Sequence, residues 1–454
     1  MIATVNPIDN TLLKRFPQHP WRKIETMLNK AESGGNINRT SVFAVRSRRL
    51  HVLADLLETR QAECAALITL EMGKPIGEAL AEVQKCVKVC RYYADHARHF
   101  LPDEPVHTEW SQSFVTYLPL GTILAIMPWN FPFWQVFRFA AAALMAGNAV
   151  LLKHAPNVPQ CALAIERLFI DANFPEGIFQ NVFIENEKVQ WLIADPRTHA
   201  ITFTGSPTTG AKVAEMAGKH LKKTVMELGG SDPFIVLDDA VLKDAAMCGV
   251  QSRMTNCGQS CIAAKRFIVT EAIAADFTRL MTNHIKQLKI GNPNEPETQI
   301  GPLARPDLLQ NIERQVRESV QKGAQIVTGG SKVLGTKGNF YHPTLLINAA
   351  KGMPIFEEEV FGPVASIAVV KNANDAIALA NDTLYGLGAS IWTSDTDRAL
   401  RFARQLQSGV AAVNTLVQSD PRLPFGGLKR SGYGRELSEH GIREFVNIKT
   451  IILK

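Results

Sequence analysis

Residues 149–184 read AVLLKHAPNVPQCALAIERLFIDANFPEGIFQNVFI, and this stretch predicts the fold class. Its ends, AVLLKH at 149–154 and QNVFI at 180–184, are short apolar runs typical of buried strands. Residues 160–172, between them, carry apolar side chains at helical spacing. Because a strand, a helix and a second strand in this order form a parallel βαβ unit, we expect an α/β fold.

The alternation of apolar strands and helical segments continues after residue 184. The predicted elements are strands at 200–204, 224–228, 233–237 and 266–270 and helices at 208–222 and from about 240. Gly229 and Gly230 interrupt the series, which then resumes and continues to about residue 413. We therefore predict two successive α/β domains.

The chain before residue 128 has a different pattern. Residues 42–72 carry apolar side chains at helical spacing up to a stop at Gly73, and residues 76–99 repeat that spacing. Two long amphipathic helices are therefore expected to come first. Residues 114–127 are rich in β-branched side chains and predict a strand, which the prolines of PWNFP at 128–132 end.

The composition restricts the class of protein. A chain of 454 residues, 46% of them hydrophobic, can form about two or three domains. The net charge of +6 and the scattered basic residues argue against a nucleic-acid partner. Since the start MIATVNPIDN has no apolar signal region and no stretch has about 18 uninterrupted apolar residues, we expect a soluble, cytoplasmic protein without membrane contact.

The seven cysteines lack metal-ligand spacing, which predicts no metal site and, for most of them, buried thiols in a reducing compartment. Cys261, in NCGQSCIAA at 256–264, follows a glycine at the end of a predicted helical stretch. It is either a packing residue or a nucleophile whose thiolate nearby backbone N–H groups favour. Cys257, four residues earlier, could join it in a metal site or a disulfide, but no further Cys or His completes such a site.

Three further segments place polar residues beside predicted strand ends. Glu227, in MELGG at 226–230, is either solvated or held over a cleft as a general base. Asn130, fixed between the prolines of PWNFP, is either a turn residue or a preorganised oxyanion donor. Gly205 and Ser206, in FTGSPTTG at 203–210, form either a simple strand-to-helix turn or a phosphate site at a helix start.

Taken together, these segments resemble the aldehyde dehydrogenase superfamily. The family has a Pro-Trp-Asn-Phe-Pro segment, a Phe-Thr-Gly-Ser turn, a Glu-Leu-Gly-Gly segment and a Gly-Gln-x-Cys segment in the order found here. LLKHAP at 151–156, EEEVFGPV at 357–364 and PFGGLKRSGYGRE at 424–436 add three matches. The resemblance covers nearly the whole chain and implies a Rossmann-like cofactor domain, an α/β catalytic domain and a small β oligomerisation element.

The resemblance also implies a reaction, the NAD(P)+-dependent oxidation of an aldehyde to a carboxylate. In it Cys261 attacks the carbonyl, and Asn130 with the Cys261 backbone N–H holds the oxyanion of the thiohemiacetal. Hydride then leaves for nicotinamide, and a water activated by Glu227 hydrolyses the thioester. The implied cofactor contacts are Trp129, Lys153, Pro156, Gly205, Ser206, Leu228, Glu359 and Phe361.

Three positions depart from the family pattern. Pro156 stands where many members carry an acidic residue that binds the adenosine ribose; without a carboxylate to repel a 2′-phosphate, NADP+ is expected to be tolerated alongside NAD+. Phe139 replaces a lysine that is sometimes assigned a proton-relay role, so any relay must use another group. Pro207 and Thr208 replace a common Thr-Glu pair, and a proline suits the first turn of a helix.

Arg138 and Ser419 match two substrate-carboxylate contacts of the succinate-semialdehyde branch of the family. A guanidinium suits a carboxylate, and the alternative for Arg138 is a surface salt bridge. Thr255 stands where the branch has a second arginine, with Arg253 and Arg422 as candidate substitutes. We expect a carboxylated aldehyde, with succinate semialdehyde first. Another aliphatic or amino aldehyde, a CoA-acylating dehydrogenase and a cofactor-free thiol esterase are the alternatives.

The resemblance divides the chain into three parts. Residues 1–105 and 121–228 form the NAD(P)-binding domain, and residues 229–436 form the catalytic domain with the nucleophilic cysteine. Residues 106–120 and 437–454 form the oligomerisation element, because their alternating segments predict strands with exposed edges that need a partner. We therefore expect a homodimer or a dimer-based tetramer.

Overall fold

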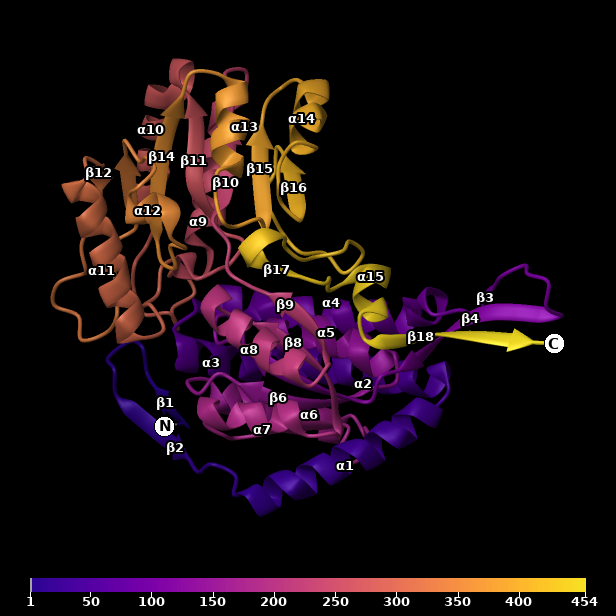
Figure 1. Cartoon of the computed structure of the whole chain (residues 1–454). Helices are drawn as coiled ribbons and strands as arrows, with labels where there is room; N and C mark the ends of the chain where they lie inside the picture. The colour runs from indigo at the N-terminus through magenta and orange to yellow at the C-terminus, as the bar shows by residue number, and fades with distance from the viewer. Residues whose placement is uncertain (1) are drawn as a thin grey trace.

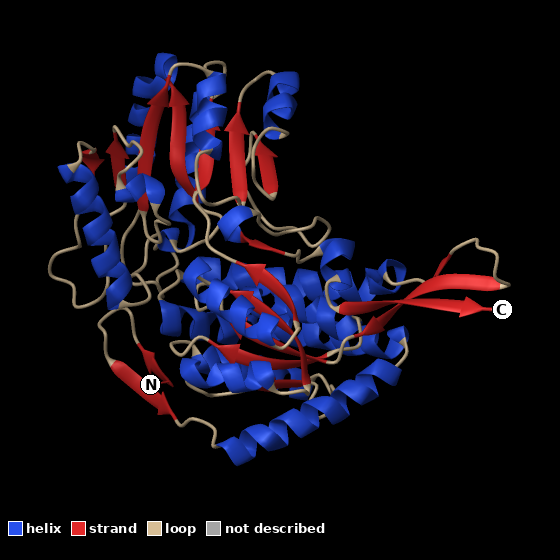
Figure 2. Ribbon diagram, viewed as in Figure 1, coloured by secondary structure: helices blue, strands red, loops and turns tan. Residues whose placement is uncertain are grey.

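The computed structural model describes residues 2–454, which form two large sheets covered by helices, a small sheet that projects to one side and an N-terminal hairpin (Figure 1). Strands and helices alternate through both large sheets (Figure 2). The α/β fold class predicted from the sequence is confirmed.

The first large sheet has six strands in the order β17-β9-β8-β5-β6-β7. The parallel strands are β5 (Thr122–Met127), β6 (Ala149–His154), β7 (Phe179–Asn181), β8 (Thr198–Thr204) and β9 (Lys223–Glu227). β17 (Gly432–Tyr433) returns from far along the chain and pairs antiparallel to β9. The helices connected with this sheet are α5 (Trp134–Met145), α6 (Pro159–Asp171), α7 (Val189–Ala194) and α8 (Pro207–Lys219).

The unit at residues 149–184 forms as predicted. β6, α6 and β7 follow one another, and β6 pairs parallel to β7 with Val150 opposite Phe179. Every residue of β6 is buried, which explains its continuous apolar run. The second strand is shorter than expected, because β7 ends at Asn181 and residues 182–184 continue as irregular backbone.

The second large sheet has seven strands in the order β12-β13-β14-β11-β10-β15-β16. Their bounds are β10 (Asp232–Val236), β11 (Ala264–Thr270), β12 (Gln325–Thr328), β13 (Thr344–Ile347), β14 (Val364–Val370), β15 (Gly388–Trp392) and β16 (Val410–Val413). Only β12, at one edge, runs antiparallel to its neighbour. The helices of this part are α9 (Leu242–Met254), α10 (Glu271–Lys286), α11 (Pro306–Gln321), α12 (Pro354–Glu357), α13 (Ala373–Asn381) and α14 (Thr396–Ala403).

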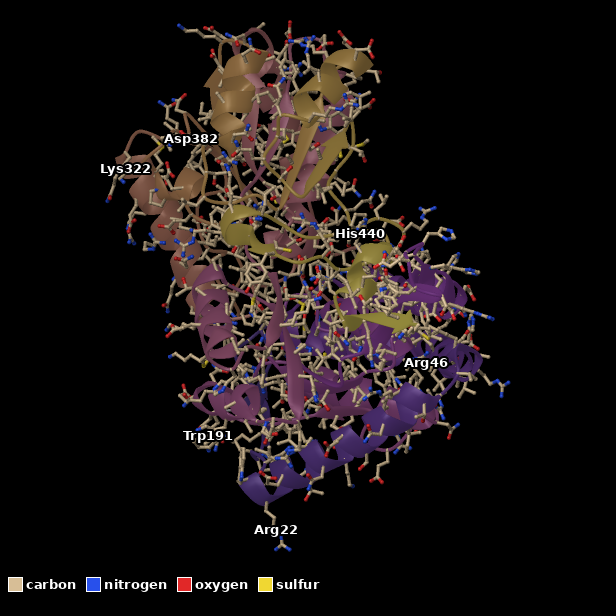
Figure 3. All side chains as sticks on the ribbon, turned by 45° about the vertical axis from the view of Figure 1, so that its right-hand side comes forward. Arg22, Arg46, Trp191, Lys322, Asp382 and His440 are labelled. Carbon is tan, nitrogen blue, oxygen red and sulfur yellow. The ribbon has the colours of Figure 1, made fainter. Side chains whose placement is uncertain are left out.

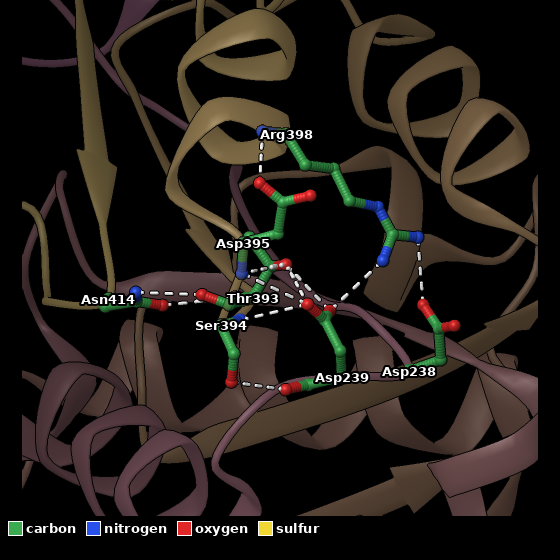
Figure 4. Close-up of polar contacts among 7 residues, drawn as sticks. All are labelled: Asp238, Asp239, Thr393, Ser394, Asp395, Arg398 and Asn414. Carbon is green, nitrogen blue, oxygen red and sulfur yellow. Dashed lines mark hydrogen bonds and ion pairs between the residues drawn. The ribbon is translucent and has the colours of Figure 1, made fainter.

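One polar network joins two loops at the carboxyl edge of the seven-stranded sheet (Figure 4). Asp239, after β10, accepts hydrogen bonds from the Thr393 hydroxyl at 2.7 Å and from the Asp395 backbone N–H at 3.2 Å. Arg398 of α14 donates to the same carboxylate at 3.1 Å. Because Asp395 caps α14, this network fixes the start of that helix against β10.

The N-terminal region differs from the prediction. A hairpin of β1 (Ile2–Val5) and β2 (Leu12–Phe16) and a helix, α1 (Trp21–Thr40), precede the expected helices. The predicted helix at 42–72 is two helices, α2 (Phe43–Thr59) and α3 (Gln61–Met72), broken at Arg60. Arg60 has non-helical backbone angles, and its side chain pairs with Asp171 of α6 at 2.6 Å. This ion pair lies at the break between α2 and α3, which the spacing of apolar residues could not reveal.

Two other predictions in this region have different outcomes. Gly73 ends α3 in the left-handed conformation (φ +75°), and α4 (Ile76–Phe100) follows, as expected. The single strand predicted at 114–127 is wrong, because the segment belongs to two strands in different sheets, β4 (Gln112–Pro119) and β5. The chain turns between them at Gly121 (φ +130°), whose N–H donates to the Asn148 side chain at 3.0 Å.

The third sheet pairs segments from opposite halves of the chain. β18 (Val446–Leu453) runs antiparallel to β4, from Val446 opposite Pro119 to Leu453 opposite Gln112, and follows the short helix α15 (Ser438–Arg443). β3 (Glu104–Pro105) lies on the other side of β4, which leaves β18 at the edge. This sheet extends away from the rest of the protein beside the C-terminus (Figure 1). The two segments of the predicted oligomerisation element, residues 106–120 and 437–454, therefore pair with each other through β4 and β18.

The surface carries charged side chains such as Arg22, Lys322 and Asp382, which point outward (Figure 3). Within residues 2–454, the helices are each too short or too polar to cross a membrane.

A glycine in β17 provides a test of how closely this strand packs against β9. Gly432, in β17, has φ +114°, and a Cβ there would lie 1.9 Å from the Met226 carbonyl oxygen. Gly335 has a similar left-handed backbone (φ +78°) but open space around it. We expect Gly335→Ala to cost only the conformational penalty, about 1 kcal/mol, and Gly432→Ala to cost clearly more. Apparent Tm values at one scan rate measure both, and equal decreases would contradict the predicted backbone clash.

Candidate active site

The site lies where the two large sheets meet. Asn130 follows β5, Ser206 follows β8 and Cys261 precedes β11, yet all three line one cavity of about 180 Å³. The carboxyl edge of the six-stranded sheet therefore faces the amino edge of the seven-stranded sheet. Ligands of open α/β sheets bind at the carboxyl edge, and the second sheet closes that space here.

Most of the residues predicted from the sequence line this cavity. They are Trp129, Asn130, Gly205, Ser206, Leu228, Cys261, Glu359 and Phe361. Six further lining residues were not predicted as site residues: Pro128, Gln135, Thr204, Gly229, Arg305 and Leu308. Of these, Gln135 was the easiest to find from the sequence, because it lies only five residues after Asn130, on the helix that follows PWNFP.

Cys261 lies in a turn rather than at the end of a helix. α9 ends at Met254, a short 3-10 turn (Thr255–Gly258) follows, and two further residues precede Cys261. Buried cations hold this loop: Arg253 donates to the Gly258 carbonyl at 2.6 Å, and Lys265 donates to the Cys261 carbonyl at 2.7 Å. Cys261 is the one partly exposed thiol among seven free cysteines.

Cys257 forms a hydrogen bond within the protein instead of the metal site or disulfide that the sequence left open. Its buried thiol donates to the Gly301 carbonyl at 3.3 Å, and it forms no disulfide. Across residues 2–454, no three His, Cys, Asp or Glu side chains gather in a metal-binding arrangement. Cys257 has a left-handed backbone (φ +54°), as does Asn256 beside it. The turn before Cys261 is therefore tightly constrained.

Asn130 is bound to the loop before Cys261 through both its side chain and its backbone carbonyl. Its side-chain amide donates to the Gln259 carbonyl at 3.1 Å, and its own carbonyl accepts from the Asn256 side chain at 2.8 Å. Asn130 is buried, with 4% of its surface exposed. These bonds fix the direction of the amide beside Cys261, which is the geometry that a preorganised hydrogen-bond donor needs.

The environment of Cys261 differs from the expected one. Burial raises the pKa of the thiol to about 11, and the cations of Arg138 and Lys265 oppose that rise. The expected stabilisation of the thiolate by nearby backbone N–H groups stays a prediction. A neutral thiol is the resting form at neutral pH.

Glu227 is the last residue of β9, directly before the cavity residue Leu228. Its side chain is 2% exposed, and its Oε1 has no hydrogen-bond partner among residues 2–454. Burial raises the pKa of this carboxyl group well above its ordinary value, the carboxylate of Glu436 adds to the rise, and Arg138 opposes it. A carboxyl group in this state holds a proton more strongly than an ordinary glutamate does.

Arg138, on α5, is 2% exposed and pairs through Nε with the carboxylate of Glu436. The alternative of a surface salt bridge is wrong, because both side chains are buried. Arg138 also interacts electrostatically with Glu227 and Cys261. Its guanidinium is thus partly engaged within the protein and does not line the cavity. Its predicted contact with a substrate carboxylate stays a prediction.

The residues predicted to hold a nucleotide lie at three strand ends. Ser206 caps α8, its hydroxyl accepting from the Thr209 N–H at 3.3 Å, and Pro207 occupies the first turn as expected. Lys153, near the end of β6, donates to the Asn186 side chain at 2.6 Å. Pro156 is exposed just beyond that strand. The first N–H groups of α8 are thus available beside the cavity that Ser206 lines.

Trp129, Glu359 and Phe361 form the opposite part of the cavity. The rings of Trp129 and Phe361 pack edge to face with centroids 5.8 Å apart. Glu359 accepts from the Gly230 N–H at 3.0 Å, and a Cβ on Gly229 would lie 2.3 Å from its Oε2. This close approach explains why glycine follows Leu228 in the sequence.

The candidate substitutes for the missing arginine are engaged elsewhere. Arg253 is buried, and its Nη2 donates to the carbonyls of Gly258, Val360 and Gly362. Arg422 is exposed and pairs with Asp420 at 2.7 Å. Thr255 lines a separate cavity with Glu78 and does not line the one that contains Cys261. The suggestion that Arg253 or Arg422 replaces the arginine is therefore not supported by their contacts.

This site and fold define a class of enzyme, and the chain belongs to the aldehyde dehydrogenase family: residues 1–451 match the model of the Aldehyde dehydrogenase family. The chain is 52% identical over 450 residues to the Synechocystis protein named "Probable succinate-semialdehyde dehydrogenase" (NADP(+)), with 99% of both chains covered. It is 45% identical over 448 residues to the Escherichia coli succinate semialdehyde dehydrogenase (NAD(P)+) Sad, covering 99% of this chain and 97% of that one.

A solved structure agrees with these relatives. The succinic semialdehyde dehydrogenase of Streptococcus pyogenes, determined in complex with NADP+, superimposes with a TM-score of 0.97 at 37% identity, and all of both chains is covered. The family expected from the sequence motifs is confirmed.

The raised thiol pKa predicts how Cys261 reacts with a neutral alkylating agent. Because only the thiolate is nucleophilic, the rate constant for iodoacetamide should rise about tenfold per pH unit from pH 7 to 9, without a plateau. Mass spectrometry of the Cys261 peptide in the protein without cofactor measures this rate, with Cys261→Ala as the blank. A plateau with a midpoint below pH 8 would contradict the neutral resting thiol.

Proposed function

We propose that this protein is a succinate-semialdehyde dehydrogenase that oxidises succinate semialdehyde to succinate with NADP+ or NAD+. The observation that carries the proposal is that Cys261, Asn130 and the α8 start converge on one cavity with Glu227 at its margin. The names of the full-length relatives from Synechocystis and Escherichia coli support the choice of substrate.

Each proposed catalytic residue has its own role in the reaction. Cys261 loses its proton and attacks the aldehyde carbon, which forms a carbon–sulfur bond and a thiohemiacetal oxyanion. The Asn130 amide and the Cys261 backbone N–H stabilise that oxyanion. Loss of the hydride from the former aldehyde carbon to a bound nicotinamide would leave a thioester on Cys261. Glu227 takes a proton from the water that hydrolyses this thioester and frees Cys261. Its raised pKa makes its carboxylate a stronger proton acceptor than that of an ordinary glutamate.

The cavity fits a nicotinamide dinucleotide, which when bound supplies the ring that accepts the hydride. Ser206 and the first turn of α8 would hold the pyrophosphate, and Gly205 leaves the backbone accessible beside them. Glu359 and Phe361 would hold the nicotinamide ribose, with Trp129 and Leu228 along the cavity wall. Lys153 would contact the adenosine ribose. Since Pro156 brings no carboxylate to that position, a 2′-phosphate is accepted, in line with the NADP(+) in the names of the relatives.

The remaining assignments follow from the same proposal. Residues 1–105 and 121–228 bind the cofactor, and residues 229–436 carry the nucleophile. Arg138 and Ser419 are assigned to the substrate carboxylate. Seven free thiols favour a reducing compartment, and we assign the protein to the cytoplasm. Glu227 disfavours a CoA-acylating reaction, because a water-activating base hydrolyses the thioester.

The proposed roles predict different behaviour for two variants. Wild-type protein with succinate semialdehyde and NADP+ should form NADPH continuously. Glu227→Gln should give about one NADPH per active site in a burst, followed by turnover at least about 100-fold slower, because thioester hydrolysis is impaired. Cys261→Ala should give neither phase. Stopped-flow absorbance of NADPH measures both phases.

A matched control for this experiment is Glu215→Gln on the exposed face of α8, which should behave as the wild type. A Glu227→Gln variant with unchanged steady turnover, or a Cys261→Ala variant that retains a burst, would contradict the assigned roles.

We also propose a homodimer or dimer-based tetramer built through the sheet of β18 and β4. β18 has a partner on one side only, and Ile448 and Ile452 are 65% and 55% exposed on it. An unpaired apolar edge of this length favours association.

Sedimentation velocity at micromolar concentration tests the oligomer. The wild type should sediment as a multiple of the 50.0 kDa chain, and Ile448→Asp with Ile452→Asp should shift it toward the monomer. Leu334→Asp, at an exposed leucine elsewhere, is the control. A monomeric wild type would exclude the proposed assembly.

A further inference from the structure

Lys85 of α4 is a half-buried cation without an anionic partner. Its Nζ donates to the Ser419 hydroxyl at 2.6 Å and lies 4.3 Å from the centroid of the Trp134 ring. No carboxylate of residues 2–454 lies within ion-pair distance of it. Because removing a charge from water costs free energy, a cation held only by a hydroxyl and a ring is suited to an anionic ligand.

The neighbouring carboxylates are already engaged. Glu82, one turn before Lys85, pairs with Lys74 and accepts the backbone N–H groups of Phe133 and Trp134 at 2.9 and 3.0 Å. Asp420, next to Ser419, is bound by Arg422 through both carboxylate oxygens. Neither side chain neutralises Lys85 directly.

Lys85 also contacts the helix that carries Arg138, α5. It interacts electrostatically with Arg138 and with Cys261. Trp134, which its ammonium group contacts, precedes the cavity residue Gln135 by one position and Arg138 by one helical turn. Burial lowers the pKa of Lys85 to about 8, with Arg138 adding to the decrease, so the group is still mainly charged at pH 7.

We propose that Lys85, together with Ser419, binds the carboxylate of the aldehyde substrate and supplies the positive charge that is missing at Thr255. This inference rests on the proposed succinate-semialdehyde activity. Ser419 was assigned to the carboxylate from the sequence, and its hydroxyl is the group that Lys85 contacts. An ammonium group and a hydroxyl 2.6 Å apart can both donate to one carboxylate.

The experiment compares succinate semialdehyde with butanal, which has the same number of carbon atoms but no carboxylate. With saturating NADP+, kcat and KM are measured for the wild type, Lys85→Met and Lys85→Arg. We expect Lys85→Met to lower the ratio of kcat/KM for succinate semialdehyde to that for butanal by about 10- to 100-fold, mainly through KM. Lys85→Arg keeps the charge and should restore most of that ratio.

The matched control is Lys88→Met, at an exposed lysine one turn later on α4, which should leave the ratio unchanged. An unchanged ratio in Lys85→Met, or an equal loss for both aldehydes, overturns the assignment of Lys85. A wild type that does not prefer succinate semialdehyde over butanal instead overturns the proposed function, whatever the variants do. Retained preference in Lys85→Met with a preferring wild type overturns the Lys85 proposal alone.

Discussion

The buried ion pair between Arg138 and Glu436 is the interaction on which the site depends most. It joins α5, which follows the first strand end of the cavity, to a segment near the C-terminus of the chain. The backbone of Glu436 exchanges two hydrogen bonds of 2.8 Å with Phe425, which anchors that segment over β9. Removing one partner of a buried pair typically costs about 3–5 kcal/mol, because the other charge is left without compensation.

The two side chains of this pair also contribute to the proton affinity of Glu227, and Arg138 contributes to that of Cys261. Arg138 is one cation among two buried carboxylates and a thiol. Burial raises the pKa of Glu227 and of the Cys261 thiol, and Arg138, which also pairs directly with Glu436, opposes both rises. The site therefore holds a neutral thiol near two buried carboxyl groups with raised pKa values. Lys85, at its border, brings the additional positive charge.

Other buried cations in the catalytic part have a structural use. Arg253 and Lys265 donate to backbone carbonyls on both sides of Cys261 and hold a turn that contains two left-handed residues. Charge alone therefore does not identify a substrate ligand. Arg253 was a candidate because it lies two positions from Thr255, but its guanidinium points into the loop, whereas Lys85, distant in sequence, meets Ser419.

The sequence by itself determined the α/β class, the strands β6, β8 and β9 and the family, because each depends on local spacing or on a short motif. The same motifs singled out Cys261, Asn130 and Glu227, whose catalytic roles are proposals. Only the tertiary structure decided the break at Arg60, the division of residues 114–127 between two sheets, the protonation of Cys261 and the neighbours of Arg138 and Lys85. These features depend on burial and on contacts between residues far apart in the chain, such as Lys85 with Ser419. Such long-range contacts leave no periodic pattern in the sequence.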